Sequence, residues 1–488
     1  MATRTPSEIT TRAMFVDGDW RPSASGETFG ATSPATGEAI ATIPQGDRDD
    51  ARRAIAAAGR AAPGWASLTA FDRAARMHAI GDAIEARRDE LARTLTLDQG
   101  KPLRAEAYGE VEELVDYWRM AAEDAKRLGG ELPNSFSAGK RVMLVRRPRG
   151  VVGIISPWNW PYTMPAELIA PALACGNSVV WNPAPSTALC AVVLAECIVE
   201  GDLPPGVFNL VTGPGPTVGN EIASNPGVQA VAFIGSTGTG RLVAEAAAGK
   251  ATLLEMGGNG PLVVMDDADV DRAVEATLTS CFLCAGQSCT AGERILVHNA
   301  VRDEYVEKLA RRVTAEILLG DPFAETTTMG PLNNEPVAVK MDEHVADAVD
   351  RGASVVSGGS RASGYPTDLY WEATVLTDVP ADARVATEET FGPVAPVVGI
   401  DSLEHAIELT NASPYGLLSA IFTRDIGCGL RFADAVHTGW VNINESSNYW
   451  ESHLPFGGRA GSDSGLGRVG GPHPMHAFTE LQTVTITV

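Results

Sequence analysis

Short apolar segments alternate with helical segments between residues 151 and 256, and this alternation restricts the fold more than any other feature of the chain. Strand and helix in regular alternation predict an α/β fold with a parallel, doubly wound sheet. Sheets of this kind bind their ligands at the carboxyl ends of their strands. The apolar segments are VVGIIS, NSVVWNP, VFNLVTG, QAVAFIG and ATLLEMGG, and the helical segments are MPAELIAPALACG, TALCAVVLAECIVEG and TGRLVAEAAAG.

Four further regions complete the expected architecture, because a chain of 488 residues is too long for one core. Residues 48–127 carry apolar positions at spacings of three and four, which predicts helices. Residues 129–150 combine turn residues with an alternating strand, which indicates a hairpin arm. Residues 260–460 again alternate strands and helices and predict a second α/β domain. The strictly alternating segment 477–488 predicts a terminal strand that pairs with an exposed edge, including one in another subunit.

Charge and apolar content exclude several classes of protein. A net charge of -23 argues against nucleic acid, whose binding depends on clustered lysine and arginine. The same charge disfavours anionic membranes. No apolar run reaches the roughly 18 residues of a membrane span, and the first 20 residues lack the apolar core of a signal peptide. We therefore expect a cytoplasmic protein with no nucleic-acid or membrane partner.

The cysteine pattern leaves one residue to explain. The chain has seven cysteines, and a large chain without a signal peptide is not expected to form a secreted disulfide framework. Cys281, Cys284 and Cys289 lie close in sequence, but a structural zinc site takes four ligands and no second pair matches them. We expect no metal. Cys289, between small polar residues in CAGQSCTAGER, either packs or acts as a nucleophile.

Three other segments carry candidate chemistry, and each also has a purely structural interpretation. In ISPWNWPYTMPAEL, Asn159 ends a strand and either stabilises an oxyanion or caps the next helix. In FIGSTGTGRLVAEA, a glycine-rich turn before a helix either approaches a phosphate or is a plain tight turn. In LLEMGGNGP, Glu255 is either a general base with a raised pKa or a surface glutamate.

The order of six sequence blocks is more specific than any one of them. SPWNWP, FIGSTGTG, LEMGG, GQSC, EETFGP and LPFGG follow one another at a spacing that resembles the aldehyde dehydrogenase superfamily over nearly the whole chain. The resemblance implies a Rossmann-type cofactor domain (1–128 and 148–256), an α/β catalytic domain (257–460) and a β oligomerisation arm (129–147 and 461–488). It also implies a homodimer or a homotetramer.

The resemblance also implies roles for individual residues. Cys289 matches the nucleophile, Glu255 the general base and Asn159 the oxyanion-stabilising asparagine, while Glu389 matches the carboxylate that holds the nicotinamide ribose and Phe391 the aromatic beside it. The implied cofactor-binding residues are Ile155, Ser156, Pro157, Trp158, Asn182, Pro185, Gly215, Gly219, Phe233, Gly235, Ser236, Gly257, Glu389 and Phe391. The expected substrate pocket comprises Trp160, Tyr162, Thr163, Met164, Glu167, Ser288, Thr290, Tyr449, His453 and Phe456.

The implied reaction is the oxidation of an aldehyde to a carboxylic acid with NAD, or with NADP as the alternative cofactor. A thiolate attacks the aldehyde, the resulting thiohemiacetal loses hydride, and water hydrolyses the thioester. Two alternatives remain at this point: a coenzyme A-acylating dehydrogenase, against which Glu255 argues, and a noncatalytic binding protein on the same fold. Such a protein would not need to keep Cys289, Asn159 and Glu255 together.

Three departures from the family pattern bear on specificity. The family usually has lysine where Asn182 stands, and many NAD-preferring members have glutamate where Pro185 stands. The sequence therefore selects neither cofactor firmly, and we predict that Asn182→Lys improves the use of NADP. Val469 replaces a glutamate that relays protons in some members, so proton exit takes another route. Aromatic residues beside Glu167, Glu445, Glu451 and His453 suit a hydroxylated, amino or aromatic aldehyde. No arginine lies beside Cys289, which argues against a carboxylate-bearing one.

Overall fold

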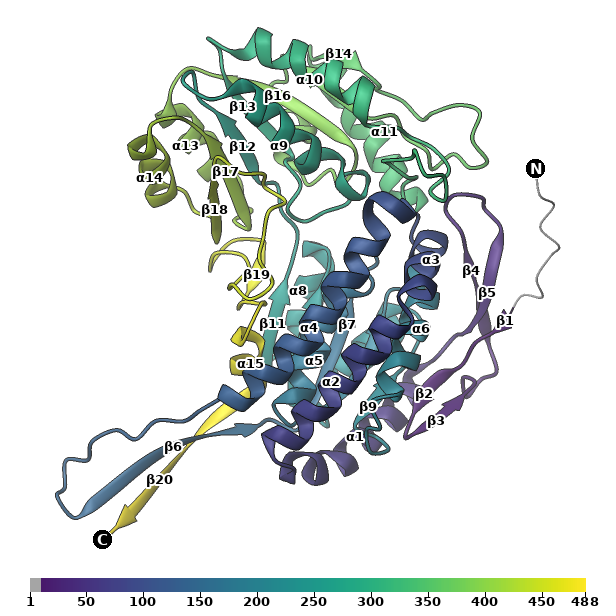
Figure 1. The fold of residues 1–488 in the computed structure, drawn as a ribbon, viewed down its shortest axis with the longest axis vertical. Helices are drawn as coiled ribbons and strands as arrows, with labels where there is room; N and C mark the ends of the chain where they lie inside the picture. The colour runs from purple at the N-terminus through teal and green to yellow at the C-terminus, as the bar shows by residue number, and fades with distance from the viewer. Residues whose placement is uncertain (1–9) are drawn as a thin grey trace.

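The computed structural model describes residues 10–488, and its first large sheet has the parallel, doubly wound centre that the sequence predicts (Figure 1). The sheet order is β19-β11-β10-β7-β8-β9-β2-β3, and β11, β10, β7, β8 and β9 run parallel. Because β7 comes first in the chain yet lies between β8 and β10, the order reverses between β7 and β10. The strands are β2 (Met14–Val16), β3 (Asp19–Arg21), β7 (Val151–Ser156), β8 (Ser178–Pro183), β9 (Phe208–Leu210), β10 (Ala230–Ile234), β11 (Ala251–Glu255) and β19 (Gly465–Leu466).

Helices cover this sheet, and those of residues 48–127 confirm the helical prediction. Asp47 and Thr69 each form a capping box at the start of a helix, which satisfies backbone N–H groups that have no partner within the helix. The helices before β7 are α1 (Arg48–Ser67), α2 (Ala70–Ala86), α3 (Arg88–Asp98), the π-helical turn η1 (Leu103–Ala107) and α4 (Tyr108–Arg127). Those after it are α5 (Thr163–Ala174), η2 (Pro185–Thr187), α6 (Ala188–Val199), η3 (Gly215–Gly219), α7 (Asn220–Ser224) and α8 (Thr237–Ala246).

A second large sheet lies above the first in Figure 1 and confirms the predicted second α/β region. Its order is β14-β15-β16-β13-β12-β17-β18, and only the β14–β15 pair is antiparallel. The strands are β12 (Pro261–Val264), β13 (Arg294–His298), β14 (Ser354–Ser357), β15 (Thr374–Thr377), β16 (Val394–Ile400), β17 (Leu418–Phe422) and β18 (Trp440–Ile443). The helices are α9 (Val270–Phe282), η4 (Leu283–Gly286), α10 (Arg302–Glu316), α11 (Glu335–Asp350), α12 (Arg384–Thr387), α13 (Leu403–Asn411) and α14 (Ile426–Ala435).

A two-stranded ribbon projects from the body at the lower left of Figure 1. It joins β6 (Lys140–Pro148) to β20 (Thr479–Thr487) in antiparallel register, and the short helix α15 (His473–Phe478) leads into it. The predicted terminal strand is therefore present and pairs within its own chain. Residues 129–139, which carry Pro133 and several serine and glycine residues, form no second strand, and one bridge between Glu131 and Leu144 is the hairpin pairing seen there.

A third, small sheet packs beside the first and contains β1 (Thr10–Thr11), β4 (Thr28–Thr32) and β5 (Ala39–Pro44). All seven cysteines are buried and free. Within residues 10–488, no helix combines the length and the apolar character that a membrane crossing requires. No cluster of His, Cys, Asp and Glu in the same range is arranged to hold a metal ion.

Candidate active site

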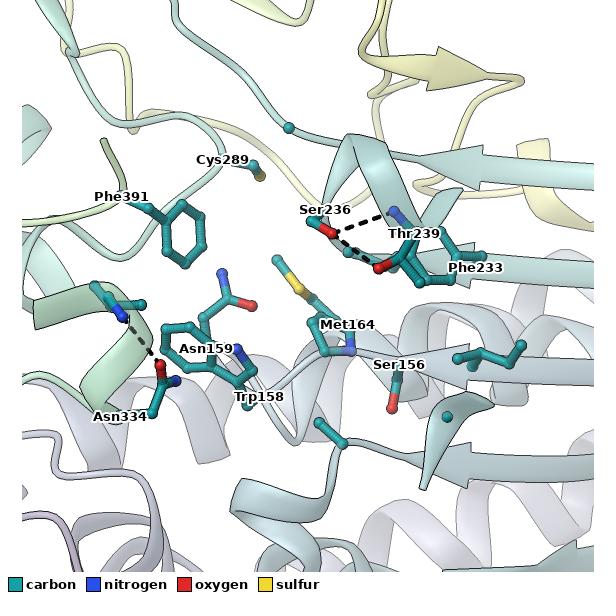
Figure 2. A pocket seen from close by; sticks show the side chains of 18 of the residues that line it. Ser156, Trp158, Asn159, Met164, Phe233, Ser236, Thr239, Cys289, Asn334 and Phe391 are labelled. Atoms are coloured by element: carbon teal, nitrogen blue, oxygen red, sulfur yellow. Dashed lines mark hydrogen bonds between the residues drawn. The ribbon is translucent and has the colours of Figure 1, made fainter. Parts of the chain in front are cut away.

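A cavity of about 470 Å³ lies where the two large sheets meet. The first sheet contributes the carboxyl ends of β7, β10 and β11, with the reversal between β7 and β10 opening a crevice for a ligand. Figure 2 shows Cys289, Asn159, Phe391 and Ser236 arranged around this space. The lining residues are Ile155, Ser156, Pro157, Trp158, Asn159, Met164, Ala184, Pro185, Gly215, Pro216, Phe233, Ile234, Gly235, Ser236, Thr239, Glu255, Gly257, Cys289, Asn334, Pro336, Val337, Lys340, Glu389 and Phe391.

Cys289 lies in the loop between η4 and β13 and is only 8% exposed. Two residues of the preceding turn, Cys284 and Ala285, adopt the left-handed backbone region at φ 55° and 53°. Such a conformation is costly for residues other than glycine and is maintained only where the surroundings impose it. Gly258 packs against this loop so closely that an added Cβ would collide with the carbonyl oxygen of Cys289. The backbone around the thiol is therefore tightly constrained.

Glu255 ends β11 and lines the same cavity as Cys289, and the two side chains are close enough to influence each other's pKa. Its Oε1 atom is buried without a partner. Burial raises the pKa of Glu255 to about 8, against the opposing effect of the Cys289 thiol, and the nearby charge of Glu389 also raises it. Burial also raises the pKa of the Cys289 thiol, and the charge of Glu255 adds to that shift. The resting pair is a neutral thiol beside a carboxyl group that can act as a base near neutral pH.

Asn159 follows β7 and points its side chain toward the cysteine loop (Figure 2). Its side-chain Nδ2 donates to the backbone carbonyl oxygen of Gln287 at 3.0 Å. The backbone carbonyl oxygen of Asn159 accepts from the Cys284 thiol at 3.6 Å. An amide NH2 has two donors, and the contact with Gln287 uses one. The second N–H is available for an oxygen bound beside Cys289.

The turn after β10 forms the opposite end of the cavity. Ser236 caps α8, with its Oγ near the Oγ1 of Thr239 at 3.0 Å and accepting from the Thr239 N–H at 3.4 Å. The N-terminal N–H groups and dipole of a helix favour an anionic group such as a phosphate. Gly235 lets the turn pack closely against Phe233, since an added Cβ would lie 2.7 Å from the Phe233 ring. This end of the cavity suits the pyrophosphate of a dinucleotide.

Glu389 and Phe391 come from the segment before β16. Oε1 of Glu389 accepts from the Gly258 N–H at 2.9 Å, and burial raises the pKa of this carboxyl while the charge of Lys340 opposes the shift. Phe391 lies edge-on to Trp158, with ring centroids 5.5 Å apart and an interplanar angle of 83°. Its backbone is left-handed at φ 60°, and its N–H donates to Glu293 at 2.7 Å. A carboxylate and an aromatic face thus stand side by side on one wall.

Two of the expected cofactor residues lie behind the cavity wall. The Asn182 amide donates to the carbonyl oxygens of Val211 and Gly213 at 2.9 and 3.2 Å, so its side chain holds two backbone segments together. Gly219 packs against Asn182. The other twelve line the cavity: Ile155, Ser156, Pro157, Trp158, Pro185, Gly215, Phe233, Gly235, Ser236, Gly257, Glu389 and Phe391.

Several expected substrate-pocket residues have structural partners. Tyr162 is fully buried and donates its hydroxyl to the carbonyl oxygen of Leu91 at 3.1 Å. Thr163 is buried in α5. The hydroxyls of Ser288 and Thr290 both bond to Oδ1 of Asn448.

The other expected pocket residues divide between exposed and buried positions. Tyr449 and His453 flank Glu451 on the surface, at 2.6 and 3.5 Å from its oxygens. Glu167 is buried, and burial raises its pKa well above the usual range, although a hydrogen bond with Tyr117 opposes this. Trp160 and Phe456 are buried aromatic residues. Of the ten expected pocket residues, Met164 is the one that lines the cavity.

One wall of the cavity consists of residues that no sequence pattern indicated. Asn334, Pro336, Val337 and Lys340 all come from the start of α11. Asn334 caps this helix and proline follows at its second position, a pattern that predicts a helix start but no ligand. These residues are brought to the site only by the packing of α11 beside the segment of Glu389, where Lys340 Nζ donates to the Glu389 carbonyl oxygen at 3.1 Å.

Comparisons with known proteins agree with this geometry. The sequence matches the profile described as "Aldehyde dehydrogenase family" over residues 20–484. It is 39% identical over 482 residues to the NADP(+)-dependent succinate-semialdehyde dehydrogenase of Escherichia coli (strain K12), with 98% of each chain covered. It is 40% identical over 475 residues to 3-sulfolactaldehyde dehydrogenase of Pseudomonas putida, covering 97% of this chain and 96% of the relative.

Solved structures show the same fold. Succinate-semialdehyde dehydrogenase from Burkholderia pseudomallei superposes with a TM-score of 0.95 at 38% identity and full coverage of both chains. Betaine aldehyde dehydrogenase from Staphylococcus aureus, in complex with NAD+, superposes with a TM-score of 0.94 at 35% identity, covering 98% of this chain and 95% of the other.

Proposed function

Since this chain belongs to the aldehyde dehydrogenase family, we propose that Cys289, Glu255 and Asn159 perform the chemical steps of its reaction. The enzyme oxidises an aldehyde to a carboxylic acid with NAD(P)+. The observation that supports these three roles is that a buried thiol, a buried carboxyl group and an amide with one uncommitted N–H line the same cavity.

The reaction begins when Glu255 takes the Cys289 proton and the thiolate attacks the carbonyl carbon of the aldehyde. The C–S bond forms, and the negative charge on the oxygen is held by the Asn159 side chain and the Cys289 N–H. The C=O bond then re-forms, hydride leaves the carbon, and a thioester remains. The nicotinamide, when bound, supplies the hydride acceptor. Glu255 then releases the proton that it took from Cys289 to solvent and takes a new proton from water. The resulting hydroxide attacks the thioester, the C–S bond breaks, and the acid leaves with Cys289 as a thiolate that recovers the proton from Glu255.

The cavity walls fit a dinucleotide. The start of α8 with Ser236 would hold the pyrophosphate, Glu389 would bind the ribose hydroxyls and Phe391 would lie beside the nicotinamide. Where the adenosine would lie, the wall consists of Ala184, Pro185, Gly215 and Pro216, and none of these is charged. We take NAD as the preferred cofactor, because no cation stands at that wall to bind the additional phosphate of NADP. NADP remains a second cofactor, because no carboxylate stands there to repel that phosphate.

The substrate in this proposal is an aldehyde whose tail is hydroxylated, aromatic or amino-substituted rather than carboxylate-bearing. Of the two lysines near the site, Lys340 stands beside Glu389 and buried Lys101 is paired with Glu110. An anionic tail would therefore have to compete with the Glu389 carbonyl oxygen for Lys340, or break the Lys101–Glu110 ion pair. Two of the relatives named above are succinate-semialdehyde dehydrogenases, whose substrate carries a carboxylate, so this proposal gives the chain a different specificity from theirs.

The experiment follows absorbance of the reduced nicotinamide with aldehydes of similar length and different charge: 3-aminopropanal, butanal and succinate semialdehyde. We expect kcat/KM for succinate semialdehyde to be at least about tenfold below that for butanal, since like charges and unpaired buried charges cost a few kcal/mol. Cys289→Ala should abolish turnover of all three while cofactor binding, measured by fluorescence, persists. Preference for the anionic aldehyde would refute the substrate class, and turnover by Cys289→Ala would refute the mechanism.

The division into domains and the assembly are part of the same proposal. The first sheet and its helices form the cofactor domain, the second sheet the catalytic domain, and the β6–β20 ribbon the oligomerisation arm. The exposed apolar residues on and beside this ribbon support the last assignment: Leu132, Phe136, Leu481 and Ile486. We propose a homodimer or homotetramer in the cytoplasm, and light scattering before and after removal of residues 479–488 tests whether the ribbon holds it together.

A further inference from the structure

A buried ion cluster lies behind the catalytic residues without lining the cavity. It comprises Lys101, Glu106 and Glu110, whose exposed fractions are 2%, 9% and 4%. Lys101 Nζ lies 2.5 Å from Oε2 of Glu110 and 3.8 Å from the ring centroid of Trp160. Burying charge is expensive, and apolar residues would often stabilise a core equally well or better. The cluster therefore calls for an explanation other than stability.

One side of the cluster holds the segment that carries Asn159. Oε1 of Glu110 accepts from the backbone N–H of Tyr162 at 3.0 Å and of Thr163 at 3.5 Å. These N–H groups lie at the start of α5, three and four residues after Asn159. Lys101 covers the ring of Trp160, the residue next to Asn159. Glu110 and Lys101 together hold the segment that directly follows Asn159, residues 160–163.

The other side of the cluster holds the loop that carries Cys289. Oε1 of Glu106 accepts from the Cys284 N–H at 3.1 Å, in the left-handed turn that leads to the nucleophile. The Cys284 thiol in turn donates to the Asn159 carbonyl oxygen, and Gln99 donates to the Cys284 sulfur at 3.4 Å. The second oxygen of Glu106 is buried without a partner, and burial raises the pKa of this carboxyl to about 7.

We propose that Glu106 and Glu110 are positioning residues that set the distance between the Asn159 amide and the Cys289 backbone N–H. The inference rests on the proposed role of these two donors in holding the oxyanion. η1 and α4 supply both carboxylates from one rigid element, so the two loops are fixed against a common frame. A displacement of about 1 Å in such a site can cost 10²-fold in rate, because donors must meet the oxygen where its charge develops.

The test is a double-mutant cycle between Glu106→Ala and Asn159→Ala. Glu106→Ala should lower kcat/KM by about 10- to 100-fold while the dissociation constant for NAD+ stays within twofold of wild type. Glu106→Gln should restore most of the loss, since its amide oxygen can accept from the Cys284 N–H. In the Asn159→Ala background, Glu106→Ala should cost less than about threefold, because the donor that it positions is already gone. If Glu106→Ala does not fold, Glu106→Leu fills the volume and takes its place.

Asp98 provides a matched control. It is also a buried carboxyl that accepts one backbone N–H, from Cys190 at 2.8 Å, and leaves its other oxygen without a partner. Burial raises its pKa to about 7 as well. Asp98→Ala should lower thermal stability about as much as Glu106→Ala does. Its effect on kcat/KM, however, should be the same factor in the wild-type and in the Asn159→Ala background. The inference would be overturned if Glu106→Ala lowered kcat/KM by the same factor with and without Asn159→Ala. It would also be overturned if the effect of Asp98→Ala shrank in the Asn159→Ala background as much as that of Glu106→Ala. An Asn159→Ala enzyme as active as wild type would instead refute the oxyanion role on which the inference rests.

Discussion

The two large sheets contribute opposite ends of their strands to the same cavity. In the first sheet, Asn159 and Ser236 follow β7 and β10, and Glu255 ends β11, so the carboxyl ends face the site. In the second sheet, Cys289 precedes β13 and Glu389 precedes β16, so the amino ends face it. The rule that parallel sheets bind ligands at their carboxyl ends therefore holds for one sheet and fails for the other.

The connection between the sheets explains the difference. β11 ends at Glu255 and β12 begins at Pro261, so a short linker carries the chain from the carboxyl edge of the first sheet directly to the amino edge of the second. The carboxyl edge of the second sheet is used structurally instead. There, Asp267 after β12 accepts from the Thr423 hydroxyl and the Arg424 N–H after β17. The first sheet supplies a crevice, and the second supplies loops that close it.

The largest expected effect comes from the carboxyl end of the first sheet. Glu255→Gln keeps the size of the side chain but removes the base, so kcat/KM should fall by about 10²- to 10⁴-fold. Because the pKa of Glu255 is raised to about 8, the wild-type rate should increase with pH up to about 8. Steady-state kinetics from pH 6 to 9 should show this rise in wild type only. The same rise in the variant would assign the base to another residue.

A second prediction compares a glycine beside the nucleophile with a glycine outside the cavity. Gly258→Ala introduces a Cβ into the carbonyl oxygen of Cys289, so it should displace the nucleophile and lower kcat/KM by about 10²-fold. Gly59→Ala, in helix α1 beside the first sheet, is the matched control, because no heavy atom lies within 4 Å of its added Cβ and Gly59 does not line the cavity. Its kcat/KM should stay near wild type. Equal losses of kcat/KM in both variants would show that the close packing of Gly258 does not position the nucleophile.

Cofactor choice should respond to the adenosine end of the first sheet. Pro185→Glu places a carboxylate on the cavity wall and should reduce kcat/KM with NADP relative to NAD by about tenfold, by repulsion of the additional phosphate. Asn182→Lys should shift the ratio toward NADP. It should also lower thermal stability, because the two hydrogen bonds from the Asn182 side chain to backbone carbonyl oxygens are lost. Kinetics with both cofactors measure the ratio. An unchanged ratio in both variants would place the adenosine elsewhere.

The smallest effect concerns stability. Burial raises the pKa of Glu255 to about 8 and that of Glu113 to about 7. Between the unfolded value near 4.5 and these values, the folded state binds more protons than the unfolded state, so the free energy of unfolding decreases as pH rises. Urea denaturation at pH 5, 6, 7 and 8 measures this slope. Glu255→Gln should flatten it, and an unchanged slope would mean that Glu255 ionises equally in both states.

The sequence predicted the elements of the first sheet well because each strand there is a compact apolar run that is bounded by turn residues. The prediction for β7 coincides with the strand, Val151–Ser156. The residues after β7, β10 and β11 meet in one cavity, as strand ends in such a sheet must. Cys289 and Glu389, in contrast, were assigned only through resemblance to a family. Nothing in their local pattern indicates that the amino ends of β13 and β16 face the same cavity.

Residues that depend on tertiary packing were less predictable. Proximity to Asn159 in sequence placed Tyr162 in the expected substrate pocket, yet the start of α5 turns its side chain into the core. Lys340 reaches the site from a helix whose amphipathic pattern is ordinary. Lys101 and Glu110 resemble solvent-exposed residues of a helical segment, and only the packing of that segment against Trp160 makes them a buried pair.

The β6–β20 ribbon has a consequence for synthesis on the ribosome. Arg149, next to β6, pairs with Glu480 of β20, 331 residues later. At a translation rate of roughly 5–20 residues per second, about 20 seconds to a minute pass between the synthesis of β6 and that of its partner strand β20. During that time its backbone N–H and C=O groups form an open edge that can recruit strands of neighbouring nascent chains. A chaperone that shields this edge should therefore increase the yield of active enzyme more than one that acts after release.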